Sequence, residues 1–137
     1  MITNAEITIF NAWADRQERK IIYLPHFIEE VWFYKDIKVS ASEGGFVRGD
    51  LFKIRIPDSC LYGWLPPERY ATLDDPETAE AWTVQDRDFF VIGRWTGGKV
   101  EDMKEVKKTY FGVMGIVNSH TENFYGANPH IRIGGGV

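Results

Sequence analysis

The chain has 137 residues, a hydrophobic share of 44% and a formal net charge of −4 at pH 7. This length predicts a single domain over residues 1–137, and five Trp, six Tyr and nine Phe residues exclude a disordered chain, which lacks the apolar surface to offset its conformational entropy. The acidic balance argues against a nucleic-acid-binding role, because a sequence-independent grip on phosphates depends on Lys and Arg.

No segment approaches the roughly 20 consecutive apolar residues that cross a bilayer, and the first residues lack a basic stretch followed by an apolar core. We therefore expect a protein made in the cytoplasm that has no membrane partner. Cys60 is the only cysteine, so no intrachain disulfide can form and a reducing compartment is indicated.

The N-terminal half reads as a series of strands. Strands are predicted at residues 7–10 and 19–24, with Pro25 interrupting the ladder of the second, and a longer run covers residues 27–39 before a loop at 40–45. Over residues 50–57, Phe52, Ile54 and Ile56 fall on one face of a pleat while charged residues fall on the other, which is typical of a half-buried strand.

The C-terminal half predicts further strands and one helix. Residues 57–81 have a weak hydrophobic pattern, in which short helical turns are expected near 66–70 and 74–80. The four consecutive apolar residues at 89–92 predict a strand buried on both faces. A short helix is predicted near residues 100–109, because acids precede bases over one apolar face. Residues 110–117 have a strand-like composition, and a turn is predicted at 118–119. Two further strands are predicted at 120–125 and 130–133, and residues 134–136 are expected to form a frayed tail. The predicted fold is mainly β, a small β-barrel or sandwich with long loops.

The sequence contains no convincing catalytic motif. The three histidines, His26, His120 and His130, lack a short metal-ligand spacing, and only a hairpin that makes His120 and His130 face each other near Glu122 would create a metal site. Asp86 and Asp88 are interpreted as turn residues. We therefore expect no metal, no cofactor and no enzymatic activity.

Apolar bulk inside the weakly patterned segment marks a candidate partner surface. Trp64 lies in the run 61–67, where exposed aromatic residues would bind a partner, although this segment could equally cap one end of a barrel. The residues predicted to form the interface are Trp64, Leu65, Pro66, Tyr70, Phe46 and Arg48.

Several short motifs, in order along the chain, carry a resemblance to a known group of proteins. They are Ile2–Ala5 with Ile7–Asn11, Val31–Phe33, Asp50 with Ile54–Pro57, and Gln85–Asp88 leading to Gly93. This ordering resembles small structural proteins of tailed bacteriophages and prophages of Gram-positive bacteria, from the minor capsid and head-to-tail connector gene region. The resemblance implies a head-closure or stopper-like β-barrel that forms a homo-oligomeric ring and contacts neighbouring neck or portal proteins, in the host cytoplasm during synthesis and then in the virion.

Two other classes of function remain open. A ligand-binding β module for a carbohydrate or host surface would use Trp64 with Tyr70 or Trp95 as a stacking platform. A small hydrolase would use His120 or His130 with an Asp or Glu, and would require these groups to converge in one pocket.

Overall fold

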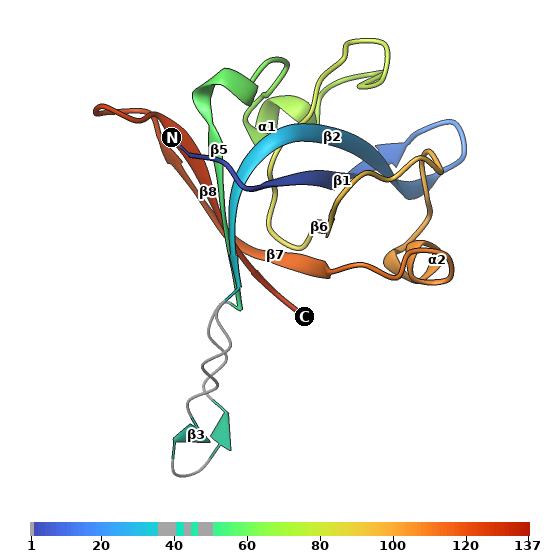
Figure 1. Ribbon diagram of the computed structural model, residues 1–137. Coiled ribbons are helices and arrows are strands. Elements are labelled where there is room, and N and C mark those ends of the chain that lie inside the picture. The colour runs from blue at the N-terminus through green and yellow to red at the C-terminus, as the bar shows by residue number, and fades with distance from the viewer. Residues whose placement is uncertain (1, 36–40, 43–44, 47–50) are drawn as a thin grey trace.

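The protein folds as a closed barrel of six antiparallel strands, seen in a computed structural model that describes residues 2–35, 41–42, 45–46 and 51–137, the two short ranges by backbone only (Figure 1). The order of strands around the barrel is β1-β2-β5-β8-β7-β6. Their bounds are β1 Ala5–Asp15, β2 Lys20–Lys35, β5 Phe52–Pro57, β6 Phe89–Ile92, β7 Met114–Asn123 and β8 His130–Gly136. The predicted small β-barrel is thus confirmed.

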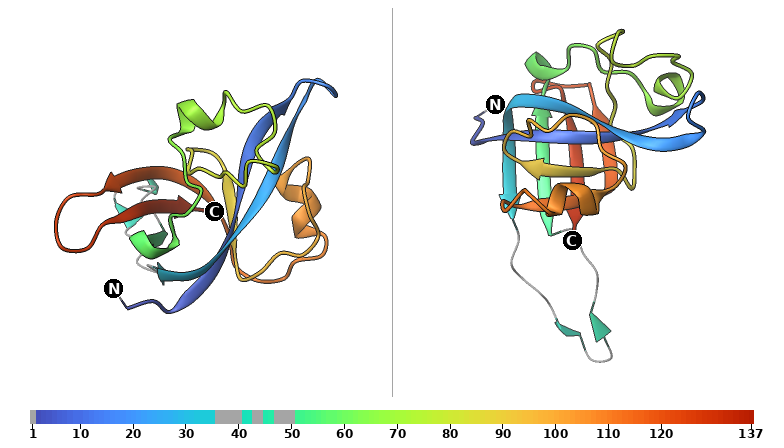
Figure 2. Two further views of the ribbon diagram at one scale, coloured as in Figure 1. Left: turned by 90° about the horizontal axis from the view of Figure 1, so that it is seen from above. Right: turned by 90° about the vertical axis from the view of Figure 1, so that its right-hand side faces the viewer.

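Short elements lie outside the barrel wall. Strands β3 (Ala41–Ser42) and β4 (Gly45–Phe46) form a separate two-stranded sheet, and the helices are η1 (Asp58–Cys60), α1 (Pro67–Tyr70) and α2 (Met103–Lys107). The segment from η1 to β6 lies over one end of the barrel, and α2 lies beside the wall (Figure 2). None of the helices in the described part of the chain has the length and apolar character needed to cross a membrane.

The helix predicted near residues 100–109 is confirmed as α2. Asp102 caps it by accepting a hydrogen bond from the Glu105 N–H, and the Glu105 carboxylate accepts one from the Glu101 N–H, so two otherwise unpaired donors are satisfied at its start. The helical turn expected near 66–70 is also present as α1, which begins with a proline. Residues 76–80 form a turn and not a helix.

The prediction that Pro25 interrupts a strand is wrong. Pro25 lies inside β2 and pairs with Phe10 of β1. Tyr23 exchanges two backbone hydrogen bonds with Val100 on the side of β2 that faces away from β1. Because backbone groups alternate in direction along a strand, the missing N–H of Pro25 points to that same outer side and removes nothing from the β1 ladder.

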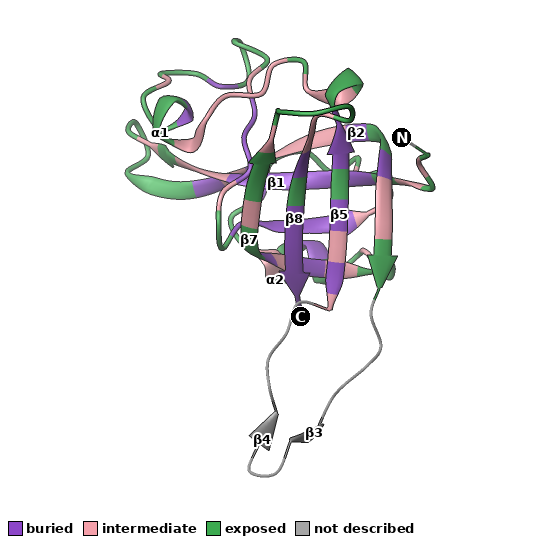
Figure 3. Cartoon of the chain, turned by 90° about the vertical axis from the view of Figure 1, so that its left-hand side faces the viewer, coloured by how far each residue is buried: buried purple, intermediate pink, exposed green. Residues whose placement is uncertain are grey.

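Two apolar clusters lie on opposite faces of the sheet formed by β1 and β6. Figure 3 shows buried stretches along β1, β5 and β8. The larger fills the barrel and includes Ile9, Ile54 and Phe90, while the smaller contains Phe89 and Val106 and lies under α2. Strand β6 contributes to both clusters, which explains its continuous apolar sequence and confirms that it is buried on both faces. The half-buried strand expected within residues 50–57 is confirmed as β5.

Two expectations for the C-terminus are wrong. The turn predicted at Asn118–Ser119 is a shift of register inside β7, which runs on to Asn123. The tail predicted to be frayed at 134–136 is buried in β8, because the Phe90 ring covers Gly135 so closely that an added Cβ would lie 2.8 Å from it. The run predicted over 27–39 ends as a strand at Lys35, and residues 36–39 lie outside the described residues.

Candidate functional site

Two loops that carry aromatic side chains meet at the end of the barrel, one where the chain leaves β5 and the other where β7 turns into β8. Tyr62 and Tyr125 are 84% and 98% exposed, and Phe124 is 38% exposed. The Trp64 ring contacts Phe124 edge to face, with centroids 5.5 Å apart, and the Asp58 N–H donates to Pro129 O, so the two loops are joined. We name Tyr62, Trp64, Phe124 and Tyr125 the end surface.

The residues predicted for a partner surface fall into different environments. Trp64 is half-buried in the end surface, and its indole N–H is buried without a hydrogen-bond partner among the described residues. The Leu65 N–H donates to Trp82 O, and Pro66 is the N-cap residue of α1, so both also have structural roles. Phe46 belongs to β4, which is described by backbone only, and Arg48 lies outside the described residues.

Tyr70 does not belong to an exposed surface, contrary to the prediction. It is 1% exposed, because α1 turns its side chain inward beneath the segment that follows. This burial, with Asp88 and Glu77 contributing, raises the pKa of its hydroxyl. Tyr70 therefore stabilises the fold and cannot contact a partner without local unfolding.

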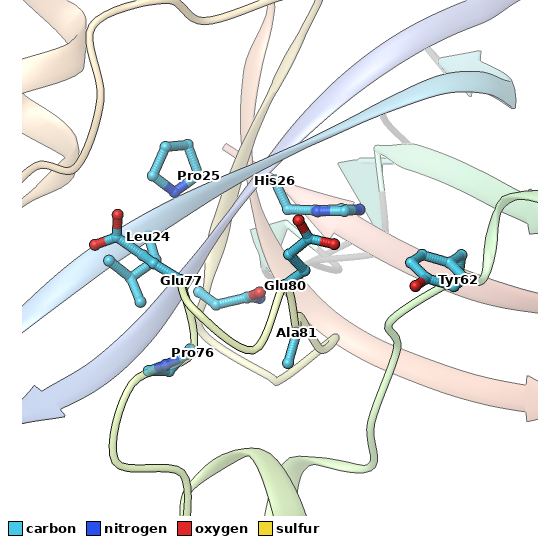
Figure 4. A pocket seen from close by; sticks show the side chains of 9 residues that line it. Leu24, Pro25, His26, Tyr62, Pro76, Glu77, Glu80 and Ala81 are labelled. Atoms are coloured by element: carbon cyan, nitrogen blue, oxygen red, sulfur yellow. The ribbon is translucent and has the colours of Figure 1, made fainter.

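A cavity of about 420 Å³ lies beside the end surface, between β2 and the loop that contains Pro76 and Ala81 (Figure 4). His26 and Tyr62 stand at one side of it, and the carboxylates of Glu77 and Glu80 approach it from the loop. A second cavity of about 380 Å³ shares His26 and Tyr62 and continues along β2. Its other lining residues are Phe27, Ile28, Glu29, Ser59, Cys60 and Arg94. We name the two cavities together the β2 groove.

His26 forms part of the floor of this groove. Its imidazole stacks on Trp82, with ring centroids 4.5 Å apart and an interplanar angle of 9°. Burial lowers the pKa of His26 to about 4, so the ring is neutral at pH 7. A neutral imidazole adds no charge to the groove, whose acidic and basic lining residues are Glu29, Glu77, Glu80 and Arg94.

Asp88 anchors the loop that precedes β6. Its carboxylate accepts hydrogen bonds from Asn11 Nδ2, the Ala12 N–H and Gln85 Nε2, all at 3.0–3.1 Å. Burial raises the pKa of Asp88 to about 6, and these three bonds oppose the rise. The Asp88 N–H also donates to Gln85 O, as expected for a turn, and the side chain links this turn to Asn11 and Ala12 of β1.

The histidines of the C-terminal hairpin do not meet. His120 Nδ1 lies 3.0 Å from an Asp86 carboxylate oxygen, whereas His130 hydrogen-bonds to Asn123 and to Asn128 O. In the β7–β8 register His130 stands opposite Asn123, and His120 opposite Ile133. The part of the chain that the structure describes contains no group of three His, Cys, Asp or Glu residues placed to hold a metal ion.

The proposed sugar-stacking platform is not assembled either. Trp95 packs edge to face against Phe10, and its indole N–H donates to Gly98 O. Tyr70 is buried, so Trp64 lacks both of the partners expected for it. The thiol of Cys60 donates to Glu30 O at 3.5 Å, which holds η1 against β2.

The β2 groove was not predicted from the sequence. A signal was present, because Pro25 and His26 are polar or non-donating residues in the middle of an otherwise apolar strand pattern. Such a break marks a position where one edge of the strand faces something other than another strand.

Comparison with family models places residues 2–136 in a family of unknown function, DUF6751, and the chain belongs to that family. No curated protein and no solved structure matches the chain. The family match covers the whole barrel, including the end surface and the β2 groove.

Proposed function

We propose that this protein is a structural component of a tailed bacteriophage or prophage, in the head-to-tail connector, where it forms a ring by subunit contacts and completes or closes the head. The observation that carries the proposal is the end surface. The ordered motifs that resemble connector-region proteins, together with a small closed barrel, support the choice of assembly.

The end surface has the composition of a protein contact. Tyr and Trp are enriched among residues that contribute most to binding, because they bury a large area with few rotatable bonds. Tyr62 and Tyr125 leave almost all of their rings in water, and the 38% exposed Phe124 contacts the half-buried Trp64 ring edge to face. Covering these rings with a neighbouring subunit would stabilise the assembly.

A ligand-binding β module is the second candidate, and the β2 groove favours it. Each of its two cavities falls within the few hundred cubic ångströms that a small ligand occupies. The stacking residues expected for a sugar are not grouped there, so the groove would recognise its ligand through Tyr62, His26 and the acidic side chains.

Quantitative mass spectrometry of phage particles, normalised to the portal protein, tests the connector role. We expect about one ring of copies per portal in particles after prophage induction. Absence from intact particles in which the portal is readily detected would refute the structural role.

A matched pair of variants tests the end surface in the same experiment. Tyr62→Ser with Tyr125→Ser should lower incorporation at least about tenfold, because aromatic contacts at an interface are each worth more than about 1 kcal/mol. The control is Phe111→Ser, which removes a ring that is 93% exposed before the opposite end of β7. Equal loss of incorporation in both variants would exclude a specific role for the end surface.

A further inference from the structure

Strand β2 has a stretch of edge that no other strand of the described residues covers. It pairs with β1 over residues 20–31 and with β5 only from Trp32 to Lys35. On the side away from β1, Tyr23 is bridged to Val100, and the Cys60 thiol reaches Glu30 O. Between these two points no described strand pairs with the outer edge of β2.

The alternation of the backbone shows which groups this edge presents. Tyr23 bonds outward to Val100, so Pro25 and Phe27 also direct their backbone groups outward, while the residues between them bond to β1. The edge therefore offers the carbonyls of Pro25 and Phe27 and the N–H of Phe27. Pro25 lacks a donor, which restricts pairing to a short strand and protects against indiscriminate aggregation.

The β2 groove follows this edge. One cavity extends along His26 to Glu29, and the other lies over the face of β2 that carries Leu24 and His26. Arg94 forms one wall, with its guanidinium 4.7 Å from the centre of the Phe27 ring, and Tyr62 forms the other. Residues 24–29 of β2 line the two cavities, so an added strand beside this edge would lie in them.

The acidic side chains that line the groove favour an added strand that carries a basic residue. Glu80 forms no ion pair with any described residue, and its carboxylate is directed toward His26 across the cavity (Figure 4). Glu77 lies beside it, with Lys99 at 3.9 Å as its partner. Side chains of an added strand point alternately to the two faces of the sheet, so every second residue would enter the cavity that Glu77 and Glu80 border.

We propose that the outer edge of β2 at Pro25 and Phe27 binds an extended segment of a partner protein by strand addition, with a Lys or Arg of that segment placed next to Glu80. Backbone hydrogen bonds then supply affinity, and the alternate basic side chain supplies specificity. The binding of a strand at this edge rests on the proposed function only for the identity of the partner. The partner would then be a neighbouring neck or portal protein.

The test measures binding of three fluorescent nonapeptides of alternating valine and threonine by anisotropy. The first has a central lysine, the second a central glutamate, and the third repeats the first with N-methylated backbone amides that cannot pair. We expect saturable binding of the lysine peptide with Kd below about 1 mM, and binding at least about tenfold weaker for the other two. Absence of saturable binding, or equal binding of the N-methylated peptide, overturns the proposal.

Variants of the protein locate the site. Phe27→Pro removes the outward N–H without touching the β1 ladder, and Phe27→Val removes the same ring but keeps the N–H. We expect the proline variant to lose binding about tenfold or more and the valine variant to stay within about threefold. Glu80→Gln should weaken the lysine peptide only, with Glu68→Gln on α1 as the control. Hydrogen exchange of the Phe27 amide in the wild-type protein, which should slow when the lysine peptide binds, gives a readout that survives if the proline variant fails to fold.

The outcomes separate this inference from the connector role. Peptide binding without incorporation into particles would leave the edge site standing and refute the connector. Incorporation without peptide binding would do the reverse. Concentration-dependent dimerisation that Phe27→Pro abolishes would show that the edge binds a second copy of this chain, and would overturn the choice of a separate partner.

Discussion

His26 and Trp82 stack face to face, with ring centroids 4.5 Å apart, and join the middle of β2 to the loop that crosses the end of the barrel. Trp82 is fully buried, and its indole N–H donates to Tyr62 O. The stack thus holds the floor of the β2 groove and the base of the end surface together. Protonation of His26 would therefore place a positive charge inside this packed layer, against the buried Trp82 ring.

The first prediction concerns His26 and pH. Its pKa is about 4 in the folded protein against an ordinary value of 6.5, so the unfolded chain binds more protons between these values. The stability that the neutral imidazole contributes is complete above pH 6.5 and falls as the pH drops toward 4, by about 3 kcal/mol. His26→Phe keeps a ring on Trp82 and should abolish this loss. Urea denaturation between pH 4 and 7 measures the difference, and parallel profiles for the two proteins would contradict the buried neutral state.

Asp88 should show the opposite dependence. Its folded pKa of about 6 exceeds the ordinary value of 3.8, so the folded state binds the proton more tightly and stability falls as the pH rises through this range. The two groups therefore offset each other in the wild-type protein. Asp88→Asn should unmask the His26 dependence, giving a free energy of unfolding that rises by about 1 kcal/mol per pH unit between pH 4 and 6. The same urea series checks this slope, whatever the absolute stability of the variant, and a variant profile parallel to that of the wild-type protein would contradict the raised pKa of Asp88.

The local pattern of the sequence predicted what depends on a single strand. Alternation at Phe52, Ile54 and Ile56 specified β5, because the strand itself directs those side chains to one face. The outer edge at Pro25 was not predictable in this way, since it depends on where β2 leaves β1 for β5. The exposure of Tyr70 was predicted wrongly for a similar reason, because its burial depends on the tertiary fold and not on its neighbours in the chain.

Asn11 should contribute more to stability than its polarity suggests. Its side chain donates to Thr83 O at 2.7 Å and accepts from the Thr83 N–H at 3.0 Å, so it pairs with that backbone as a strand would. Asn11→Ala leaves both buried groups unsatisfied and should cost about 2–4 kcal/mol in the free energy of unfolding. Asn4 offers a matched control, because it makes the same two-bond contact to the backbone of Phe33 at an exposed site.

Asn4→Ala should cost less than about 1 kcal/mol, since water replaces the lost bonds. Thermal and urea denaturation of both variants measure the comparison. Equal losses would mean that burial of the Thr83 backbone is not what makes the Asn11 contact valuable.

The last prediction concerns Gly135 and Phe90. The edge of the Phe90 ring lies against Gly135 of β8 and Gly115 of β7, and a Cβ added at Gly135 would lie 2.8 Å from a ring carbon and 3.2 Å from Ile116 O. Phe90 is 0% exposed in the middle of the barrel, so the ring has no free space to move into. Gly135→Ala should therefore destabilise the protein by about 1–3 kcal/mol through overpacking.

A double-mutant cycle with Phe90→Leu assigns this cost to the ring. The smaller side chain should relieve the clash, so that Gly135→Ala costs at least about 1 kcal/mol less in the Phe90→Leu background. Strict additivity of the two substitutions in urea denaturation would show that the Ile116 carbonyl, and not Phe90, requires glycine at this position. It would also remove the explanation for a buried strand at residues 134–136, where composition alone predicts a frayed end.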